Sequence, residues 1–297
     1  MTLKFNTIGL FGTHQKPLVA ETVLRTKNLL ESWNCRVIVE TVTASALAEK
    51  PKEIGDLDLL GKNCDLVITI GGDGNLLNAA RHLSLHNVPV LGINRGQLGF
   101  LTDISPDAVE PMLKAIFAGE YQESKCFLIE GEIKRDGKRV CHGNALNDIV
   151  LFPGDIAQMI EFELHINSTF VYSQRSDGLI ISTPTGSTAY ALSAGGPIIQ
   201  PNLNALVLVP KLPHTLTSRP LVIDADSVIS LSIPEYNKLE PKLSFDGQHH
   251  FSLSIGDEVT IKKQSAPLRL IHPKEYNYYR VLRTKLQWGT QLIPLSK

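Results

Sequence analysis

A single carboxylate set among glycines, in the run Gly71-Gly72-Asp73-Gly74, is the residue group of this sequence best suited to chemistry on a phosphate. Glycine has no Cβ, so its backbone can approach a phosphate closely and present N–H groups to it. Asp73 could accept a hydroxyl proton, bind a divalent cation, or do both. The structural alternative is an ordinary strand-to-helix turn with Asp73 as helix N-cap. The run matches neither the P-loop nor the G-x-G-x-x-G dinucleotide motif.

Two further segments carry groups that suit a nucleotide. The run 92–100 is a second glycine-rich loop, in which Arg95 could neutralise a phosphate or be a solvated loop charge. The run 176–197 reads as a strand, a hydroxyl-rich turn, a short helix and a glycine exit. Hydroxyls and free N–H groups where a helix begins suit an anion, and Tyr190 could stack on a base or fill the core.

The pair Asn147-Asp148 precedes an apolar run and could read a nucleoside. An amide matches a base edge, and a carboxylate accepts from sugar hydroxyls. The alternative is an Asx turn before a strand. Asp246, in the run 244–248, adds another carboxylate near a glycine turn. His249-His250 lacks further ligands at a useful spacing, so we expect a solvated strand end there rather than a metal site.

The first 120 residues alternate between strand-like and helix-like patterns. The expected strands are 5–11, 36–41, 65–70 and 88–93, and the expected helices are 17–33, 76–85 and 105–117. The run 65–70 is short, apolar and rich in β-branched residues, which is typical of a strand buried on both faces. The alternation predicts an open α/β domain with a mostly parallel sheet. Ligands bind beyond the carboxyl ends of such strands, which is where the Asp73 loop lies.

After about residue 120 the pattern becomes that of antiparallel β structure, with a hairpin signal at Asp136-Gly137 and one helical interruption near Ser187. The expected strands include 128–134, 138–142, 160–166, 170–173, 228–233, 259–261 and 268–271. We therefore expect an α/β domain over 1–120 and a β-rich domain over 121–272, with the active site in the cleft between them. The C-terminal tail, 273–297, is expected to pack back on the first domain.

Composition narrows the class of partner. Lys and Arg total 29 against 30 Asp and Glu, so the formal net charge is -1 and the basic excess of a nucleic-acid-binding protein is missing. The four scattered cysteines form no C-x-x-C pair, which favours reduced thiols over a disulfide scaffold or a zinc site. No signal-peptide h-region or membrane-length apolar run is apparent. The sequence predicts a cytoplasmic protein that acts on a small molecule, without nucleic acid or membrane.

Together the motifs resemble the signature blocks of the NAD kinase family, in that family's order and spacing. The matching blocks are Ile70–Gly74, Gly92–Asn94, Gly96–Leu101, Asn147-Asp148 and Ser176–Pro197. The resemblance covers essentially the whole chain and is to bacterial members above all. It implies transfer of the γ-phosphoryl of ATP to the 2′-hydroxyl of the adenosine ribose of NAD, which yields NADP.

The resemblance also implies roles for single residues. Asp73 would be the general base and would help orient metal-bound phosphates, with no metal held firmly by the protein itself. The implied nucleotide-binding residues are Gly72, Asp73, Gly74, Asn147, Asp148, Arg175, Asp177, Thr185, Ser187, Thr188, Ala189, Tyr190, Ala191, Leu192, Ser193 and Gln248. A divalent cation (Mg²⁺ or Mn²⁺) and ATP would be the cofactors, and the β domain would form the contact of a homodimer or homotetramer. Asn75 stands where many members carry Thr, which leaves ATP or polyphosphate open as donor.

Two other functions stay open from the sequence. A kinase of a sugar phosphate or a lipid would share the Asp73 loop, but it would not require Asn147-Asp148 or the hydroxyl-rich block. A non-catalytic NAD(P)-sensing protein would bind the dinucleotide, but it would have no need of a base at Asp73.

Overall fold

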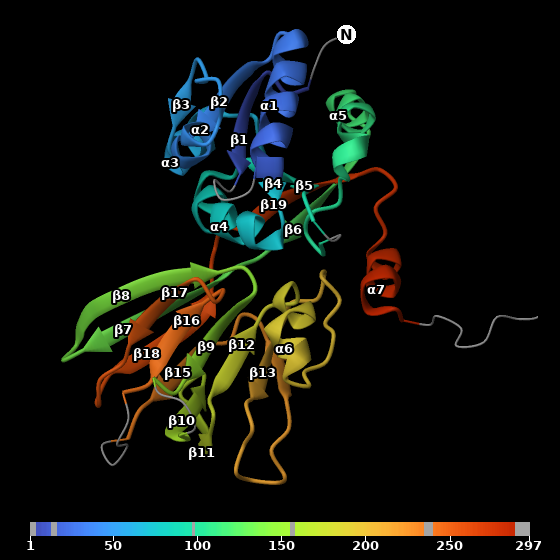
Figure 1. Ribbon diagram of the computed structural model, residues 1–297. Coiled ribbons are helices and arrows are strands. Elements are labelled where there is room, and N and C mark those ends of the chain that lie inside the picture. The colour runs from blue at the N-terminus through green and yellow to red at the C-terminus, as the bar shows by residue number, and fades with distance from the viewer. Residues whose placement is uncertain (1–3, 13–16, 97–98, 155–157, 235–239, 289–297) are drawn as a thin grey trace, which may run out of the picture. The chain divides into compact units, whose positions relative to one another are not determined.

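The computed structural model describes residues 4–12, 17–96, 99–154, 158–234 and 240–288. The chain divides into two compact units. The first consists of the residues up to Lys125 together with those from Leu268 onward, and the second is Cys126–Pro267. Figure 1 labels most of the elements of both.

The first unit is built on one sheet, sheet A, with strand order β3-β2-β1-β4-β5-β19-β6 (Figure 1). Its strands are β1 (Thr7–Gly12), β2 (Arg36–Glu40), β3 (Ile54–Gly55), β4 (Leu66–Gly71), β5 (Pro89–Asn94), β6 (Tyr121–Cys126) and β19 (Leu268–Pro273). The pairings β3-β2, β2-β1, β1-β4, β4-β5 and β5-β19 are parallel. The helices of this unit are α1 (Pro17–Ser32), α2 (Thr41–Ser45), α3 (Leu57–Asn63), α4 (Asp73–Leu83), α5 (Val109–Phe117) and α7 (Tyr278–Leu286).

Helices cover sheet A on both faces. Gly9 and Gly12 of β1 point to opposite faces, since they are an odd number of residues apart. A Cβ on Gly9 would lie 2.9 Å from Leu60 of α3, and one on Gly12 would lie 3.0 Å from Val19 of α1. This double cover explains why β4 and β5 are mostly apolar and are buried along their whole length.

The structure corrects the expected place of residues 268–271. The sequence predicts another strand of the β-rich domain, whereas β19 pairs in parallel with β5, with Arg269 opposite Pro89. Strand β6 is the next neighbour of β19 in sheet A, and its Glu123 forms an ion pair with Arg269 at 2.7 Å. Periodicity identifies a strand but does not say which distant strand it pairs with, and that is why the expected boundary differs here.

The second unit contains two antiparallel sheets. Sheet B has the order β11-β10-β15-β18-β7-β8, and sheet C has the order β14-β13-β12-β9-β16-β17 (Figure 1). The strands of sheet B are β7 (Ile129–Arg135), β8 (Lys138–Ala145), β10 (Ile160–Ile166), β11 (Thr169–Ser176), β15 (Ile229–Ser232) and β18 (Glu258–Lys263). Those of sheet C are β9 (Asp148–Phe152), β12 (Leu179–Ser182), β13 (Ala205–Pro210), β14 (Leu221–Asp224), β16 (Lys242–Phe245) and β17 (His249–Ser252).

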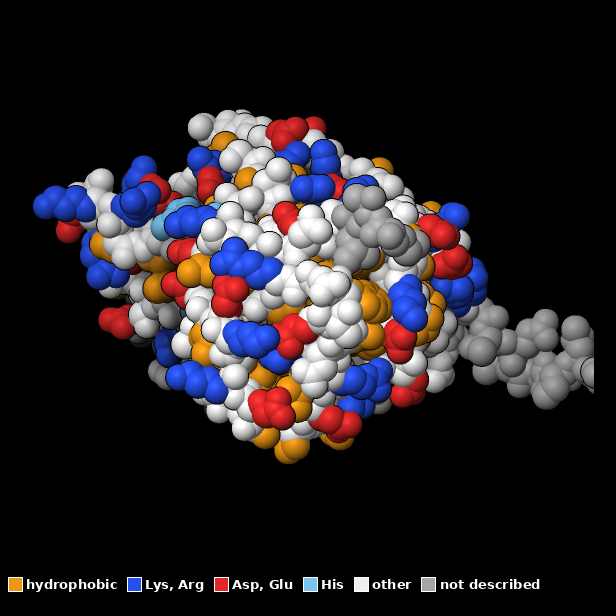
Figure 2. Space-filling view, turned by 90° about the horizontal axis from the view of Figure 1, so that it is seen from above, with side chains coloured by type: hydrophobic (Ala, Val, Ile, Leu, Met, Phe, Trp, Pro, Cys, Tyr) orange, Lys and Arg blue, Asp and Glu red, His pale blue; other side chains and the backbone are white. Residues whose placement is uncertain are grey.

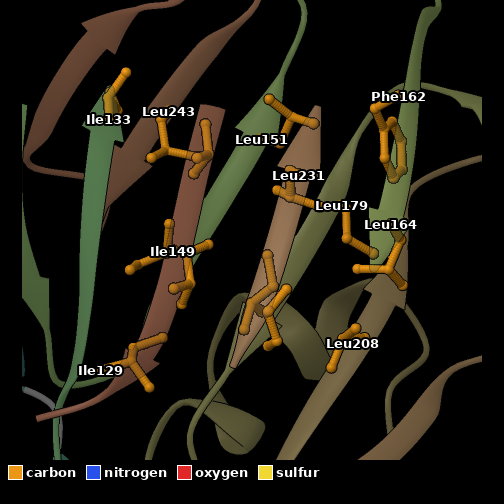
Figure 3. Close-up of a cluster of buried hydrophobic side chains, with 14 of the residues drawn as sticks. Ile129, Ile133, Ile149, Leu151, Phe162, Leu164, Leu179, Leu208, Leu231 and Leu243 are labelled. Atoms are coloured by element: carbon orange, nitrogen blue, oxygen red, sulfur yellow. The ribbon is translucent and has the colours of Figure 1, made fainter. Parts of the chain in front are cut away.

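Sheets B and C pack face to face over one apolar core. Figure 3 shows Ile133 and Phe162 of sheet B in the same buried cluster as Leu151 and Leu243 of sheet C. These side chains alternate along their strands with residues that point away from the core, as in other β-sandwiches. The shared core therefore holds the strands of sheet C in place, together with the polar residues that lie on them.

Sheet C is also covered on its other face. The segment that contains a 3-10 turn (Gly186–Thr188) and α6 (Tyr190–Ser193) places Ala191 and Ile199 against Val150, Ile180 and Val207. Burial on both faces explains the continuous apolar runs of β12 and β13. The helical interruption expected near Ser187 is this covering segment.

The predicted fold class, a mostly parallel α/β domain followed by an antiparallel β-rich domain, is confirmed. The cleft expected between the domains stays a prediction. On the face seen in Figure 2, acidic and basic side chains are interspersed, with no broad field of one sign. In the part of the chain that the structure describes, no helix is long and apolar enough to span a membrane. Cys35, Cys64, Cys126 and Cys141 are all unpaired thiols.

Candidate active site

The turn between β4 and α4 needs glycine at Gly71 for internal reasons. Gly71 has a φ of +149°, and a Cβ there would lie 2.7 Å from Nδ2 of Asn75. That amide donates to the carbonyl of Ile70 at 2.9 Å, which ties the first turn of α4 to the end of β4. Asn75 therefore stabilises the loop from within.

Gly72 and Gly74 have no such internal requirement. A Cβ on either residue would meet no atom within 4 Å, and both residues are exposed. They stand at the N-terminus of α4, where backbone N–H groups and the helix dipole favour an anion. The open space above these two glycines leaves room for a phosphate.

The carboxylate of Asp73 is held by the second glycine-rich loop. Oδ2 accepts the N–H of Phe100 at 2.7 Å, and Oδ1 accepts the N–H of Leu101 at 3.2 Å and the hydroxyl of Thr102 at 3.1 Å. Asp73 is therefore not a helix cap, because its side chain points to another loop. Arg95 of the same loop donates to Leu18 and Thr22 of α1, at 3.0 and 2.7 Å.

A cavity of about 350 Å³ lies on the face of sheet C that points away from sheet B. Val150 and Phe152 of β9 and Ser244 of β16 form its floor, since they alternate with the core residues Ile149 and Leu151. The full lining is Asn147, Asp148, Val150, Phe152, Ala189, Tyr190, Lys211, Ser244, Asp246 and Gly247. This volume lies in the range of small-molecule sites.

The turn that presents Asn147 and Asp148 is fixed by Asp246. Its carboxylate accepts the N–H groups of Leu146, Asn147 and Asp148, at 3.0, 2.8 and 3.2 Å. Asp246 and Gly247 have φ values of +50° and +65°, as the two central residues of a type I′ hairpin turn require. From the other side, Thr183 donates its N–H to the carbonyl of Asn147 at 2.9 Å. The pair Asn147-Asp148 is therefore held in one conformation.

Asp148 titrates close to neutral pH. Its side chain is buried, and burial raises the pKa of the carboxyl from 3.8 to about 7, with repulsion from Asp246 adding to the effect. A carboxyl in a pocket with such a pKa can accept a hydrogen bond when ionised and donate one when protonated. Perturbed groups of this kind cluster at functional sites.

Ser244 and Lys211 add two more polar groups to the pocket. The Oγ atom of Ser244 is buried and has no hydrogen-bond partner among the described residues. The ammonium of Lys211 lies 5.3 Å from the centroid of the Tyr190 ring, a cation–π contact. Tyr190 itself is 44% exposed, so it does not fill the core. An apolar floor, an aromatic ring and a few convergent polar groups suit a nucleoside.

Of the site residues expected from the sequence, the structure brings Asn147, Asp148, Ala189 and Tyr190 together in this pocket. Gly72, Asp73 and Gly74 lie on the β4–α4 turn. The others, outside the pocket lining, are Arg175, Asp177, Thr185, Ser187, Thr188, Ala191, Leu192, Ser193 and Gln248. A role in binding stays a prediction for all of them.

Several of the residues outside the lining have internal contacts. Ser187 is buried, and its hydroxyl donates to the carbonyl of Pro184 at 2.6 Å and accepts the N–H of Ile199 at 2.9 Å. Ala191 packs in the core on sheet C. Arg175 is exposed and lies 4.0 Å from Glu161.

Three lining residues, Val150, Phe152 and Lys211, were not singled out from the sequence. After Asp148 the strand β9 is a continuous apolar run, so the pattern does not show that Val150 and Phe152 face a pocket. Asp246 was noted only as a carboxylate beside a glycine turn. Its position at a hairpin turn next to an apolar strand was the available signal.

Side chains that could ligate a metal ion are not clustered in the part of the chain that the structure describes. Within the described ranges, no three or more His, Cys, Asp and Glu side chains come together as a metal site. His249 and His250 are exposed residues of the edge strand β17, and the His250 ring packs edge-on against Phe152 at 5.8 Å.

Two family models cover most of the chain. Residues 8–121 match the ATP-NAD kinase N-terminal domain, and residues 146–273 match the ATP-NAD kinase C-terminal domain. This chain belongs to the NAD kinase family. The similarity to an NAD kinase expected from the sequence is thereby confirmed, and so is the activity of phosphorylating NAD to NADP.

Two bacterial NAD kinases are similar to this chain over nearly its full length. The NAD kinase of Hahella chejuensis (strain KCTC 2396) is 52% identical over 287 residues, which are 97% of each chain. That of Pseudomonas fluorescens (strain SBW25) is 49% identical over 288 residues, again 97% of each.

Solved structures of NAD kinases share the fold. The crystal structure of yeast NADH kinase complexed with NADH aligns with a TM-score of 0.87 at 25% identity, over 98% of this chain and 90% of that chain. An NAD kinase from Archaeoglobus fulgidus in complex with ATP aligns with a TM-score of 0.70 at 25% identity, over 95% and 98%.

Proposed function

We propose that this NAD kinase transfers the γ-phosphoryl of ATP to the 2′-hydroxyl of the adenosine ribose of NAD, with Asp73 as the general base. In this step the hydroxyl O–H bond breaks and its proton passes to Asp73. The freed oxygen forms the new O–P bond, and the bond between the γ-phosphorus and ADP breaks. One observation carries the proposal: an oriented carboxylate stands at the start of α4, between two glycines with open space above them.

The phosphates of ATP would approach the backbone of Gly72 and Gly74. N–H groups at a helix start, arranged before the reaction, stabilise the charge of a transferring phosphoryl group without reorganisation. A general base contributes typically about 10²–10⁴-fold, so such electrostatic stabilisation must supply the larger share of the rate.

A divalent cation, Mg²⁺ or Mn²⁺, fits this site only as a partner of the phosphates. Mg²⁺ is commonly bound through one or two carboxylates plus substrate phosphates, and Asp73 is the carboxylate present on this loop. When bound, the cation would neutralise phosphate charge.

The pocket on sheet C would hold a nucleoside of NAD. Tyr190 supplies a partly exposed ring on which a base can stack, and Asn147 supplies an amide for a base edge. Asp148 can accept from a ribose hydroxyl or an amino group. This assignment is supported by the carboxylate of Asp246, which holds Asn147 and Asp148 in place through their backbone N–H groups.

Substitution of Asp73 by Asn tests the base. We expect Asp73→Asn to fold and to bind NAD in calorimetric titration, while kcat falls by about 10²–10⁴-fold. Asp107→Asn, at an exposed carboxylate in the 3-10 turn before α5, is the matched control and should keep wild-type turnover. An Asp73→Asn enzyme with wild-type kcat would show that Asp73 is not the base.

A homodimer or homotetramer formed through the β-rich domain is the assembly we propose. Apolar side chains gather on the edge strand β14 and the loop before it: Leu212, Leu216, Leu221 and Val222 are 74%, 91%, 39% and 47% exposed. Edge strands and exposed apolar groups are usually covered in solution. Sedimentation velocity of the wild type and of Leu216→Glu/Val222→Glu decides this, since a monomeric wild type contradicts the assembly.

The unpaired thiols support a cytoplasmic location.

A further inference from the structure

A chain of hydrogen bonds leads to the Asp73 carboxylate through two buried side chains. The N–H of Gly96 donates to Oδ1 of Asn94 at 2.7 Å. Nδ2 of Asn94 donates to the hydroxyl of Thr102 at 2.9 Å, and that hydroxyl donates to Oδ1 of Asp73 at 3.1 Å. Asn94 and Thr102 are 3% and 1% exposed. Solvent therefore has little access to either side chain.

The donor and the acceptor of every hydrogen bond in this series are fixed. A backbone N–H can only donate, so Oδ1 of Asn94 faces Gly96 and the amide NH₂ faces Thr102. An NH₂ group also only donates, so the Thr102 oxygen is the acceptor of that bond. The hydroxyl proton of Thr102 is left for Asp73, whose ionised carboxylate can only accept.

The two oxygens of Asp73 are consequently unequal. Oδ1 accepts two hydrogen bonds, from Thr102 and from the N–H of Leu101, whereas Oδ2 accepts one from Phe100 among the described residues. A carboxylate oxygen has two lone pairs, so Oδ2 keeps a place for one more donor. The geometry directs an incoming hydroxyl to that oxygen.

A glycine in the same loop shows that the loop is shaped around the carboxylate. A Cβ on Gly99 would lie 1.9 Å from Oδ1 of Asp73 and 2.4 Å from the Thr102 hydroxyl oxygen. Any larger residue at this position would force the carboxylate and the loop apart. The protein's own packing against Asp73 therefore requires glycine at Gly99, whereas Gly72 and Gly74 have no such internal requirement.

We propose that Thr102 and Asn94 are positioning residues for the reaction: they hold Oδ1 of Asp73 so that Oδ2 meets the reacting hydroxyl. This inference rests on the proposed role of Asp73 as base. A misplacement of a reacting group by about 1 Å can cost about 10²-fold in rate. Loss of the Thr102 hydroxyl should therefore lower kcat rather than substrate affinity.

The test compares three threonine variants in the full-length enzyme. Thr102→Val has nearly the same shape without the hydroxyl, and we expect kcat to fall by about 10- to 10²-fold while KM for NAD and for ATP changes less than about twofold. Thr102→Ser restores the hydroxyl and should recover most of kcat. Thr69→Val is the matched control, since Thr69 is equally buried in β4 and donates to the Leu91 carbonyl at 3.3 Å.

Each outcome decides the question. Wild-type kcat in Thr102→Val overturns the inference, as does a Thr102→Ser enzyme that stays slow or a Thr69→Val enzyme that slows equally. If Thr102→Val does not fold, Thr102→Ala is measured in the same way. Asp73→Asn separates the two proposals: an active Asp73→Asn refutes the base, whereas an inactive Asp73→Asn beside an active Thr102→Val refutes only the positioning role.

Discussion

Asp148 and Asp246 are joined by two hydrogen bonds across the ends of β9 and β16. The N–H of Asp148 donates to the carboxylate of Asp246 at 3.2 Å, and the N–H of Asp246 donates to the carbonyl of Asp148 at 3.0 Å. The same proximity sets two carboxyl groups side by side in the pocket, with Asp148 buried. The arrangement that fixes Asp148 for a ligand therefore also disfavours its charge.

Replacement of Asp148 by Asn should stabilise the protein at alkaline pH. The pKa of Asp148 is raised to about 7 in the folded protein from an ordinary 3.8. Between these values the folded state binds more protons than the unfolded state, so stability falls as pH rises from about 4 to about 7. Asp148→Asn removes this loss. We expect its melting temperature to exceed that of the wild type at pH 8 and to match it near pH 4, in differential scanning calorimetry.

The same variant should bind NAD more weakly, because the amide cannot replace a carboxylate acceptor. Titration with NAD at pH 8 measures this. Asp107→Asn serves again as the exposed control, with an unchanged melting temperature at both pH values. An Asp148→Asn effect of equal size at pH 4 and pH 8 would contradict the raised pKa.

Replacement of Ser244 by Ala should separate stability from binding. The Ser244 hydroxyl is buried without a partner among the described residues, and such a group costs about 1–3 kcal/mol. We expect Ser244→Ala to be at least as stable as the wild type in urea unfolding. If a bound nucleoside uses this hydroxyl, affinity for NAD should fall by about 3- to 10-fold, the worth of one hydrogen bond.

Ser187→Ala is the contrasting variant. Its hydroxyl already has a donor and an acceptor inside the protein, at Ile199 and Pro184. Removal should lower the unfolding free energy by about 1–3 kcal/mol. Weaker NAD binding in Ser187→Ala but not in Ser244→Ala would reverse the assignment of these two serines.

The sequence predicted the parts of the fold that depend on local pattern. The apolar run of β4 and the glycines after it predicted a buried parallel strand that ends at a ligand loop, and the structure has this arrangement. The placement of residues 268–271 in the β-rich domain was wrong, since a strand of alternating residues can pair in either domain. Pairing over such a distance depends on side-chain complementarity, such as that of Arg269 and Glu123.

The site was predictable only as far as its motifs are contiguous. Asn147, Asp148 and Tyr190 stood out by their residue types and their sequence context, and all three line the pocket. Lys211, which directly follows β13, belongs to no motif but lines the pocket. The bond between Thr102 and Asp73 joins two loops 29 residues apart, and no spacing rule links a threonine to a carboxylate over that distance.

Replacement of Gly74 by Ala should make the protein more stable and less active. Gly74 lies in the first turn of α4, and a Cβ there would meet no atom within 4 Å. Ala in a helix is more favourable than Gly by about 0.5–1 kcal/mol, so the free energy of unfolding should rise by this amount. If a phosphate of ATP lies against this backbone, the added methyl group occupies its place. A loss of about 1.4 kcal/mol of binding free energy corresponds to a tenfold loss of affinity, so KM for ATP should rise about 10-fold or more. Urea unfolding and initial-rate kinetics with varied ATP measure the two effects, and a stabilised Gly74→Ala enzyme with wild-type KM for ATP would place the phosphate elsewhere.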